Sequence, residues 1–300
     1  MATKPNTAAV YDDEALAIRP RNVQFDWTDV PLHYLPGEPF ATQFWNVMHL
    51  VVPVGEQLMA GCLADALPYI TDERLREEAI GFIGQETMHA ASHGGYHEHL
   101  AAHGIDIEPV ARNVSQMLRT VFGGHGLTGR AEQEWLAERL AFYAGMEHFT
   151  AVVGQWLLDA SALDEARMHP MMLDLLRWHG AEEVEHRSVL FDVFQHVDGG
   201  YGRRARTAVI GSMGLLATWL IVADYLIRHD PSHRWWKPWP LRMLRSARRG
   251  LIPNPFFFLT EIPPYLKPGF HPSGMGSPDK AIAYLATAPA AHAAGGEAQR

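Results

Sequence analysis

The chain contains very little cysteine, since Cys62 is the single one among its 300 residues. One thiol excludes an intrachain disulfide and a metal cluster held by several thiolates. An excess of positive charge is also missing, because the net charge is −9. Such a chain is a poor candidate for sequence-independent binding of nucleic acid, so we expect no nucleic-acid partner.

A basic and then apolar leader is missing from the first residues, MATKPNTAAVYDDEALAIRP, which carry acidic residues instead. This pattern does not match a secretory signal and predicts a cytoplasmic protein, with membrane association as an addition discussed below. We expect residues 1–38 to form an N-terminal extension. The Ala-rich end, residues 281–300, is expected to be a flexible tail.

Sustained period-two alternation is rare in the sequence, which argues against a sheet, whereas apolar residues recur at helical spacing. We expect an all-α fold in which residues 39–200 form a ferritin-like four-helix bundle with one long connection between its second and third helices. Pro53 and Gly55 should kink the first helix. Residues 201–280 should add C-terminal helices and an aromatic extension that packs on the bundle. The predicted helices span residues 39–66, 72–103, 109–122, 130–160 and 170–197.

Two Glu-x-x-His patterns carry the chemistry, Glu86 with His89 and Glu183 with His186. Residues three apart share a helix face, so each pair can reach one cation. Glu56 and Glu147 lie on the preceding helices in apolar surroundings. The order Glu, then Glu-x-x-His, therefore occurs twice, and it is the ligand set of two-metal carboxylate proteins with a ferritin-like bundle. Without thiolates, these oxygen and nitrogen donors suit two iron ions, with manganese or a mixed Fe/Mn pair as alternatives.

A simpler interpretation makes each glutamate a buried ion-pair partner, for example of Arg139 or Arg187. It explains one glutamate easily but four poorly, because unpaired buried carboxylates are costly and metal coordination would offset that cost for all of them. We therefore predict Glu56, Glu86, His89, Glu147, Glu183 and His186 as metal ligands.

Other polar side chains share the helix faces of these six residues. His93 and His179 are candidates for additional ligands or for hydrogen-bond partners of ligands, although ordinary core histidines explain them as well. Tyr143 is a candidate hydrogen-bond donor to the site, and the alternative is that it serves only ordinary core packing. Glu182 and Glu185 should point to other faces, where they are solvated or ion-paired.

The segments FIGQETMHAASH, YAGMEHFTAVVG, HGAEEVEHRSVLFDV and YLKPGFHP resemble those of bacterial proteins described as predicted metal-dependent hydrolases of the ferritin-like superfamily. The resemblance covers roughly residues 23–272 and implies the six ligands named above. Oxygen chemistry is common in that superfamily, which is an analogy at the level of the fold.

Residues 208–227 are mostly apolar, flanked by arginines and followed by Trp235, Trp236 and Trp239. They predict a buried fifth helix, a helix that spans a membrane, or peripheral membrane contact through residues 208–249. The last alternative would favour an apolar substrate.

For function, the ligand set favours an oxidoreductase, in which iron activates dioxygen as co-substrate to hydroxylate or desaturate a small organic, apolar substrate. This chemistry needs an electron donor. The first alternative is a metal-dependent hydrolase that uses a metal-activated water. The second alternative is metal storage or sequestration without catalysis.

Overall fold

The computed structural model describes residues 18–232 and 238–290, and these two ranges contain helices and no strand. The prediction of an all-α protein is therefore confirmed. The main helices are α1 (Pro39–Ala66), α2 (Glu73–Gly94), α3 (Tyr96–Ala102), α4 (Glu108–Phe122), α5 (Arg130–Asp159), α6 (Ser161–Glu165), α7 (Pro170–His186), α8 (Val189–Val197), α9 (Tyr201–His229), α10 (Trp239–Arg248), α11 (Phe257–Tyr265) and α12 (Pro278–Leu285), with short 3₁₀ turns at Leu67–Tyr69 and Pro272–Gly274.

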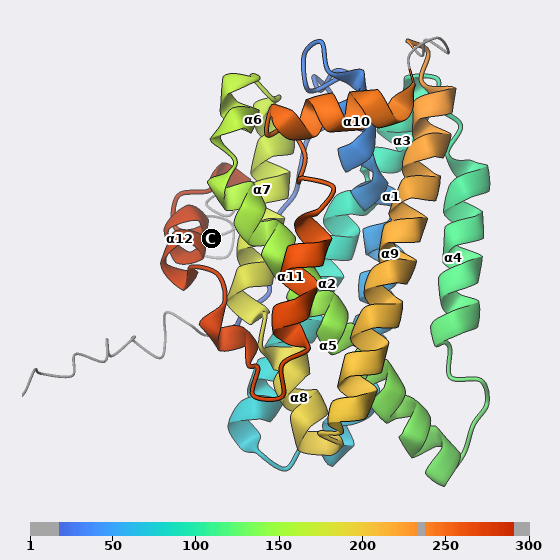
Figure 1. The fold of residues 1–300 in the computed structure, drawn as a ribbon, viewed down its shortest axis with the longest axis vertical. Helices are drawn as coiled ribbons and strands as arrows, with labels where there is room; N and C mark the ends of the chain where they lie inside the picture. The colour runs from blue at the N-terminus through green and yellow to red at the C-terminus, as the bar shows by residue number, and fades with distance from the viewer. Residues whose placement is uncertain (1–17, 233–237, 291–300) are drawn as a thin grey trace, which may run out of the picture.

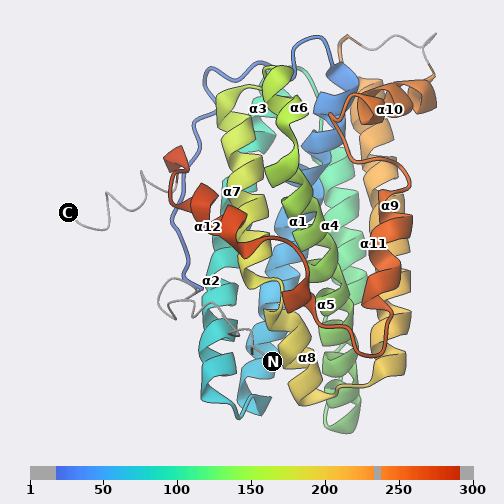
Figure 2. The same ribbon diagram turned by 60° about the vertical axis from the view of Figure 1, so that its left-hand side comes forward.

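Four of the long helices lie side by side, with α1 packed against α2 and α5 packed against α7 (Figures 1 and 2). Their bounds agree closely with the predicted ones, with two differences. The second predicted helix is divided into α2 and α3 at Gly94 and Gly95, which favour the helix less than other residues except proline. The helix predicted over residues 170–197 is divided into α7 and α8 by a turn at Arg187 and Ser188.

The start of α2 and the middle of α1 follow from local chemistry. Asp72 precedes α2 and its side chain accepts a hydrogen bond from the backbone N–H of Leu75 at 3.0 Å, which is an ordinary N-cap. Within α1, Pro53 has no N–H to donate to the carbonyl of His49. The Nε2 of His97 donates to that carbonyl instead, at 2.5 Å, so α1 continues through the proline with its freed acceptor satisfied.

Two apolar layers fill the interior between these helices. One layer includes Trp45, Leu100 and Trp178, and the other includes Leu63, Phe82 and Phe194. Along α1 the first layer ends at Val54 and the second begins at Met59, so Glu56 falls between them. The same change of layer occurs on α5 around Glu147, and also between Phe82 on α2 and Tyr96 on α3 and between Val184 on α7 and Val189 on α8. The polar residues of the centre thus lie where the two apolar layers meet.

The C-terminal helices cover the outside of this assembly. Helix α9 packs along α5 and α1, α11 packs on α5 and α9, and α12 packs on α7. Helix α12 differs from the expected flexible tail, because Ala281 and Leu285 are buried and the hydroxyl of Tyr284 donates to Asp174 at 2.7 Å. Residues 291–300 of that predicted tail, and Trp235 and Trp236, lie outside the described residues.

Two helical segments of the described chain are long and apolar enough to cross a membrane, Pro39–Tyr69 and Tyr201–His229. Length and composition alone are weak evidence, because the core helix of a soluble protein passes the same test. The first segment is 61% buried over its most apolar window and the second only 33%. The first is therefore explained by the core, and the second leaves much of its apolar surface exposed.

Candidate metal centre

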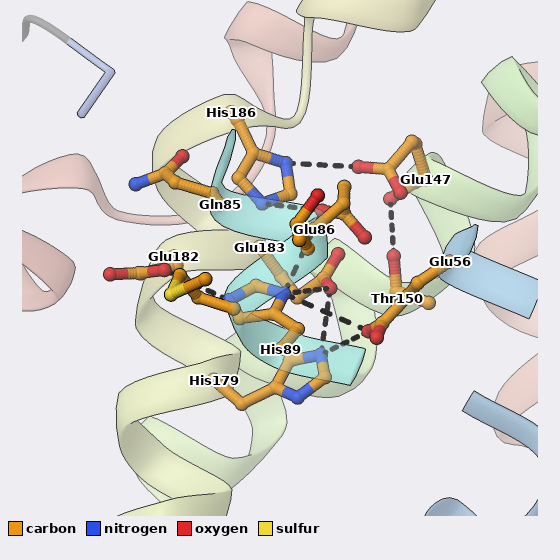
Figure 3. Close-up of polar contacts among 12 residues, drawn as sticks. Glu56, Gln85, Glu86, His89, Glu147, Thr150, His179, Glu182, Glu183 and His186 are labelled. Carbon is orange, nitrogen blue, oxygen red and sulfur yellow. Dashed lines mark hydrogen bonds and ion pairs between the residues drawn. The ribbon is translucent and has the colours of Figure 1, made fainter. Parts of the chain in front are cut away.

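The six predicted ligands meet in one place inside the protein. Glu56 comes from α1, Glu86 and His89 from α2, Glu147 from α5, and Glu183 and His186 from α7, and their side chains point toward a common centre (Figure 3). All of them are buried, with at most 5% of any residue exposed. The structure thus brings together the residues that the two repeated motifs predicted, and their role as ligands remains a prediction.

Two overlapping groups of side chains have the spacing of a metal site. Ligand atoms of Glu56, His89, His179 and Glu183 lie within 4.8 Å of one another, and so do those of Glu86, His89, Glu183 and His186. Glu147 is in neither group, but its Oε2 lies 3.0 Å from Nδ1 of His186. His89 and Glu183 belong to both groups, so the two candidate positions for a cation adjoin each other.

His179 belongs to one of the two groups of candidate metal donors, whereas the sequence made it only a candidate for an additional ligand or a hydrogen-bond partner of one. Its Nε2 lies 2.8 Å from Oε1 of Glu183 and 3.3 Å from Oε1 of Glu56. On α7 it is one turn before Glu183, which is why the helical spacing made it a candidate. The structure therefore places a seventh donor beside the predicted six.

Many polar atoms of the cluster have no hydrogen-bond partner in the described residues. These buried atoms are both carboxylate oxygens of Glu56 and Glu86, Oε1 of Glu147, Oε2 of Glu183, Nδ1 of His89 and Nε2 of His186. Burial and the neighbouring carboxylates raise the pKa of Glu56 and Glu86 well above its usual value. Unsatisfied buried carboxylates cost several kcal/mol each, on the order of the penalty for any buried charge. A divalent cation bound among them would satisfy these atoms, so the donor set fits a metal.

Hydrogen bonds behind the cluster hold His89 in one orientation. The Nε2 of His89 lies 2.9 Å from Oε2 of Glu182, which is fully buried. Arg21 binds Glu182 at 2.7 Å and Glu185 at 2.9 Å, and Gln85 donates to Glu185 at 2.8 Å. Of the two roles expected for Glu182 and Glu185, the structure shows ion pairing. Sequence reasoning missed Arg21 because it lies in an irregular segment without a motif.

A row of histidines leads away from the cluster. The Nδ1 of His179 lies 2.8 Å from Nε2 of His93, whose Nδ1 lies 3.0 Å from Nδ1 of His49. All three rings are buried, and burial lowers the pKa of His179 to about 4 and those of His93 and His49 well below the usual value. At neutral pH the three imidazoles are therefore uncharged. His93 thus contacts a candidate donor, although no candidate metal group contains it.

The remaining predicted roles receive no support from the contacts. Tyr143 packs against the rings of Phe122 and Phe142 in the second apolar layer, as its packing alternative predicted. Arg139 pairs with Asp65 at 3.0 Å. Arg187 donates to backbone carbonyls, including that of Pro272 at 3.1 Å. The simpler interpretation, in which these two arginines neutralise the buried glutamates, is therefore not what the structure shows.

Protons compete for the same atoms in the metal-free protein, which predicts a pH dependence. Burial opposes charge on His186, but its hydrogen bond to Glu147 and the nearby carboxylates raise its pKa to about 9. A histidine whose folded pKa exceeds the unfolded value of 6.5 stabilises the fold below pH 6.5, and this stabilisation is lost as the pH rises through 9. Burial and the charge of Glu183 raise the pKa of Glu147 from 4.5 to about 7. Ionisation of this carboxyl therefore also lowers the stability of the folded protein as the pH rises toward 7.

We therefore expect the chelator-treated protein to lose stability between pH 6.5 and pH 9, by on the order of 3 kcal/mol. Thermal unfolding followed by circular dichroism at several pH values measures this slope. The variant His186→Gln should flatten it, whereas His125→Gln, on an exposed loop, should not. A melting temperature of the metal-free protein that rises across this interval would contradict the expectation.

The fold and the site together define a class: a helical protein with a buried cluster of carboxylates and imidazoles suited to divalent metals. The model of a family described as predicted metal-dependent hydrolase matches residues 19–276, and the chain belongs to this family. No curated protein matches the chain, and no solved structure matches it either.

Proposed function

We propose that this protein is a metal-dependent hydrolase with a two-metal centre in a ferritin-like arrangement of α1, α2, α5 and α7. The observation that carries the proposal is the pair of overlapping donor groups with unsatisfied buried atoms, in a chain that belongs to a family described as predicted metal-dependent hydrolase. The proposed ligands are Glu56, Glu86, His89, Glu147, Glu183 and His186, with His179 as a further donor.

Charge and geometry favour two cations over one. Four carboxylates balance the charge of two divalent ions. A carboxylate has two oxygens and can bridge two cations, whereas Nδ1 of His89 can bind one, so Glu183 is the natural shared ligand of the two groups. One position would then use Glu56, His89, His179 and Glu183. The other would use Glu86 and His186 with Glu147 and the shared Glu183.

Two metal ions held there would lower the pKa of a bound water toward neutrality and polarise a carbonyl or phosphoryl oxygen of the substrate. The protein's own groups prepare this chemistry. Because Nε2 of His89 donates to Glu182, the lone pair of Nδ1 faces the cluster. Burial raises the pKa of Glu182, and the ion pair with Arg21 opposes that rise. The two apolar layers exclude bulk water, which strengthens every electrostatic interaction at the centre.

A candidate substrate cavity adjoins α5 and α7, and its lining contains none of the proposed ligands. A cavity of about 260 Å³ is lined by His148 and Val184, the residues that directly follow Glu147 and Glu183. Helix α11 contributes Phe257 and Glu261 to its wall. Its mixture of apolar and polar side chains suits a small organic substrate that carries a hydrolysable ester or phosphate.

A second candidate function is the oxidation of an organic substrate with dioxygen. The observation that favours it is the repeated Glu-x-x-His on α2 and α7, which is the ligand pattern of two-iron and two-manganese carboxylate proteins. The same side chains would hold iron, and the reaction would require electrons from a donor. Oxidation requires dioxygen, whereas hydrolysis proceeds without it, so one experiment separates the two candidate functions.

The test loads chelator-treated protein anaerobically with Zn²⁺ or Mn²⁺ and assays a panel of nitrophenyl carboxylic and phosphoric esters. Hydrolysis that is lost in Glu183→Gln and retained in the surface variant Glu77→Gln would support the first proposal. Oxygen uptake by the reduced ferrous protein, with no anaerobic hydrolysis, would replace it with the second. Uptake of far more metal than about two ions per chain would favour storage and overturn both.

A further inference from the structure

The C-terminal part of this acidic chain contains one strongly basic segment. From Pro231 to Thr260 the sequence has no aspartate or glutamate, although the whole chain has a net charge of −9. Within it, the ten-residue helix α10 and the residue after it carry four arginines, Arg242, Arg245, Arg248 and Arg249. Glu38 pairs with Arg245 and Arg249, and one carboxylate leaves an excess of positive charge on this segment. Such an excess in an acidic chain points to a partner that is negative.

Helix α10 places leucines and arginines on the same exposed face. Leu241, Leu244, Arg245 and Arg248 follow the spacing i, i+3, i+4 and i+7, and all four are exposed. Leu241 exposes 65% of its surface. Leucines exposed beside arginines are typical of a helix that lies at the boundary between water and lipid, where the long arginine side chain reaches the headgroups.

Helix α9 presents a longer apolar strip. Ile210, Met213 and Ile221 are 61%, 60% and 67% exposed and share one face of the helix with Gly214 and Ala217. The opposite face of α9 packs on α5 and α1 along its length, where Ala208, Val222 and Leu226 are buried. A helix that is half packed on the protein and half apolar toward the outside can lie along a membrane but does not cross it alone.

These features occupy one side of the molecule. In both ribbon views α9, α10 and α11 form the same flank, and α11 packs against α9 (Figures 1 and 2). Helix α11 and the residue before it add Phe256 and Leu259 to the exposed apolar side chains. Of the fourteen large apolar residues exposed in the described chain, nine lie on or next to these three helices. Such a concentration exceeds the scattered surface apolar residues of an ordinary soluble protein.

We propose that this flank, formed by α9, α10 and α11, is a peripheral docking surface for membranes that contain anionic lipids. The arginines of α10 match the negative headgroups, and the apolar side chains of the three helices enter the acyl boundary. A second copy of the chain is a poorer match, because a two-fold contact through this flank would bring the two basic α10 helices toward each other. The proposal is independent of any metal at the centre.

The experiment is flotation of the full chain with vesicles of phosphatidylcholine mixed with phosphatidylglycerol, and in parallel with vesicles of phosphatidylcholine alone. The wild type should float with the anionic vesicles and much less with the neutral ones. The double variant Ile210→Ser/Ile221→Ser should weaken binding about tenfold or more. Arg245→Gln/Arg248→Gln should weaken it about tenfold on anionic vesicles, and added salt should act in the same direction.

Matched controls lie on α4 and at the start of α5. Met117→Ser/Val121→Ser removes two exposed apolar side chains from α4, and Arg112→Gln/Arg130→Gln removes two exposed charges. Both controls should bind vesicles like the wild type, and circular dichroism establishes that every variant is folded. The proposal is overturned if the wild type does not float, or if the control variants lose binding as much as the flank variants. It is also overturned if Ile210→Ser/Ile221→Ser converts a dimer to a monomer without changing flotation.

Discussion

Replacing Glu86 with glutamine should lower the metal content of the purified protein from about two divalent ions per chain to one or fewer. Both oxygens of Glu86 are buried and make no hydrogen bond within the described residues, and Oε1 lies 3.2 Å from Nε2 of His186. A cation held by these two donors is therefore the expected occupant. An amide has one oxygen and no charge, so it is a poor replacement for a carboxylate ligand. The measurement is elemental analysis of protein purified without added metal, and again after anaerobic loading with ferrous iron.

The same substitution should stabilise the metal-free protein. Burial and the charges of Glu183, Glu56, Glu147 and Glu182 raise the pKa of Glu86, so its charged form opposes folding in the absence of metal. Glutamine avoids this cost, and we expect a gain of about 1–3 kcal/mol in the free energy of unfolding. Urea unfolding with and without chelator measures both effects, and metal should no longer stabilise the variant.

Glu77→Gln is the matched control, because Glu77 is exposed on the same helix. It should leave metal content and stability unchanged. If Glu86→Gln retains the metal of the wild type, or if the wild type binds little metal even after loading, the two-metal interpretation of the cluster fails. The chain would then be a helical protein that tolerates several protonated buried carboxylates.

The second large effect concerns Gly154 on α5 and Gly180 on α7. A Cβ atom on Gly154 would lie 2.3 Å from the carbonyl oxygen of Gly180 and 2.9 Å from its Cα. The two helices thus touch backbone to backbone, two turns from Glu147 and one turn from Glu183. Gly154→Ala must push α5 and α7 apart, which should lower the free energy of unfolding by about 3 kcal/mol. The separation also displaces ligands on both helices, so metal affinity should fall at least tenfold, roughly 1.4 kcal/mol.

Gly61→Ala provides the comparison, since no atom of the described residues lies within 4 Å of a Cβ at this helical position of α1. There alanine should stabilise the protein by about 0.5–1 kcal/mol, because glycine loses more backbone entropy on folding. Urea unfolding and metal titration of both variants measure the expected differences in stability and in metal affinity. Equal stability of Gly154→Ala and Gly61→Ala would show that the α5 and α7 backbones are not in contact.

The sequence predicted those parts of the structure that depend on local periodicity. The first helix has the predicted bounds, Pro39–Ala66, and Asp72 caps the second as expected. The six buried residues of the centre follow from two repeated motifs, because helical spacing places a Glu-x-x-His pair on one face and apolar neighbours turn that face inward.

Contacts between distant segments could not be predicted in this way. Arg21 reaches Glu182 and Glu185 from an irregular segment, where no periodicity shows which residue is buried. The helix predicted over residues 170–197 breaks after His186, where the sequence has no marker such as glycine or proline. Helix α12 was expected to be part of a tail because alanine-rich composition does not reveal that Tyr284 can bind Asp174. Each of these features depends on contacts with residues that are distant in the sequence and come together only in the folded protein.

The row formed by His179, His93 and His49 has a consequence for how a cation at the centre is sensed. Each neutral imidazole carries one hydrogen, so neighbouring rings must share a common direction of donation. Without metal, Nε2 of His179 donates to Glu183 and its Nδ1 accepts, which makes His93 and then His49 donors toward the cluster. A cation bound to Nε2 of His179 would reverse this direction: Nδ1 would become the donor, and the tautomers of His93 and His49 would change with it. Binding at the proposed centre would thus change which nitrogen of His49 carries the hydrogen, because His49 is linked to the centre through His93.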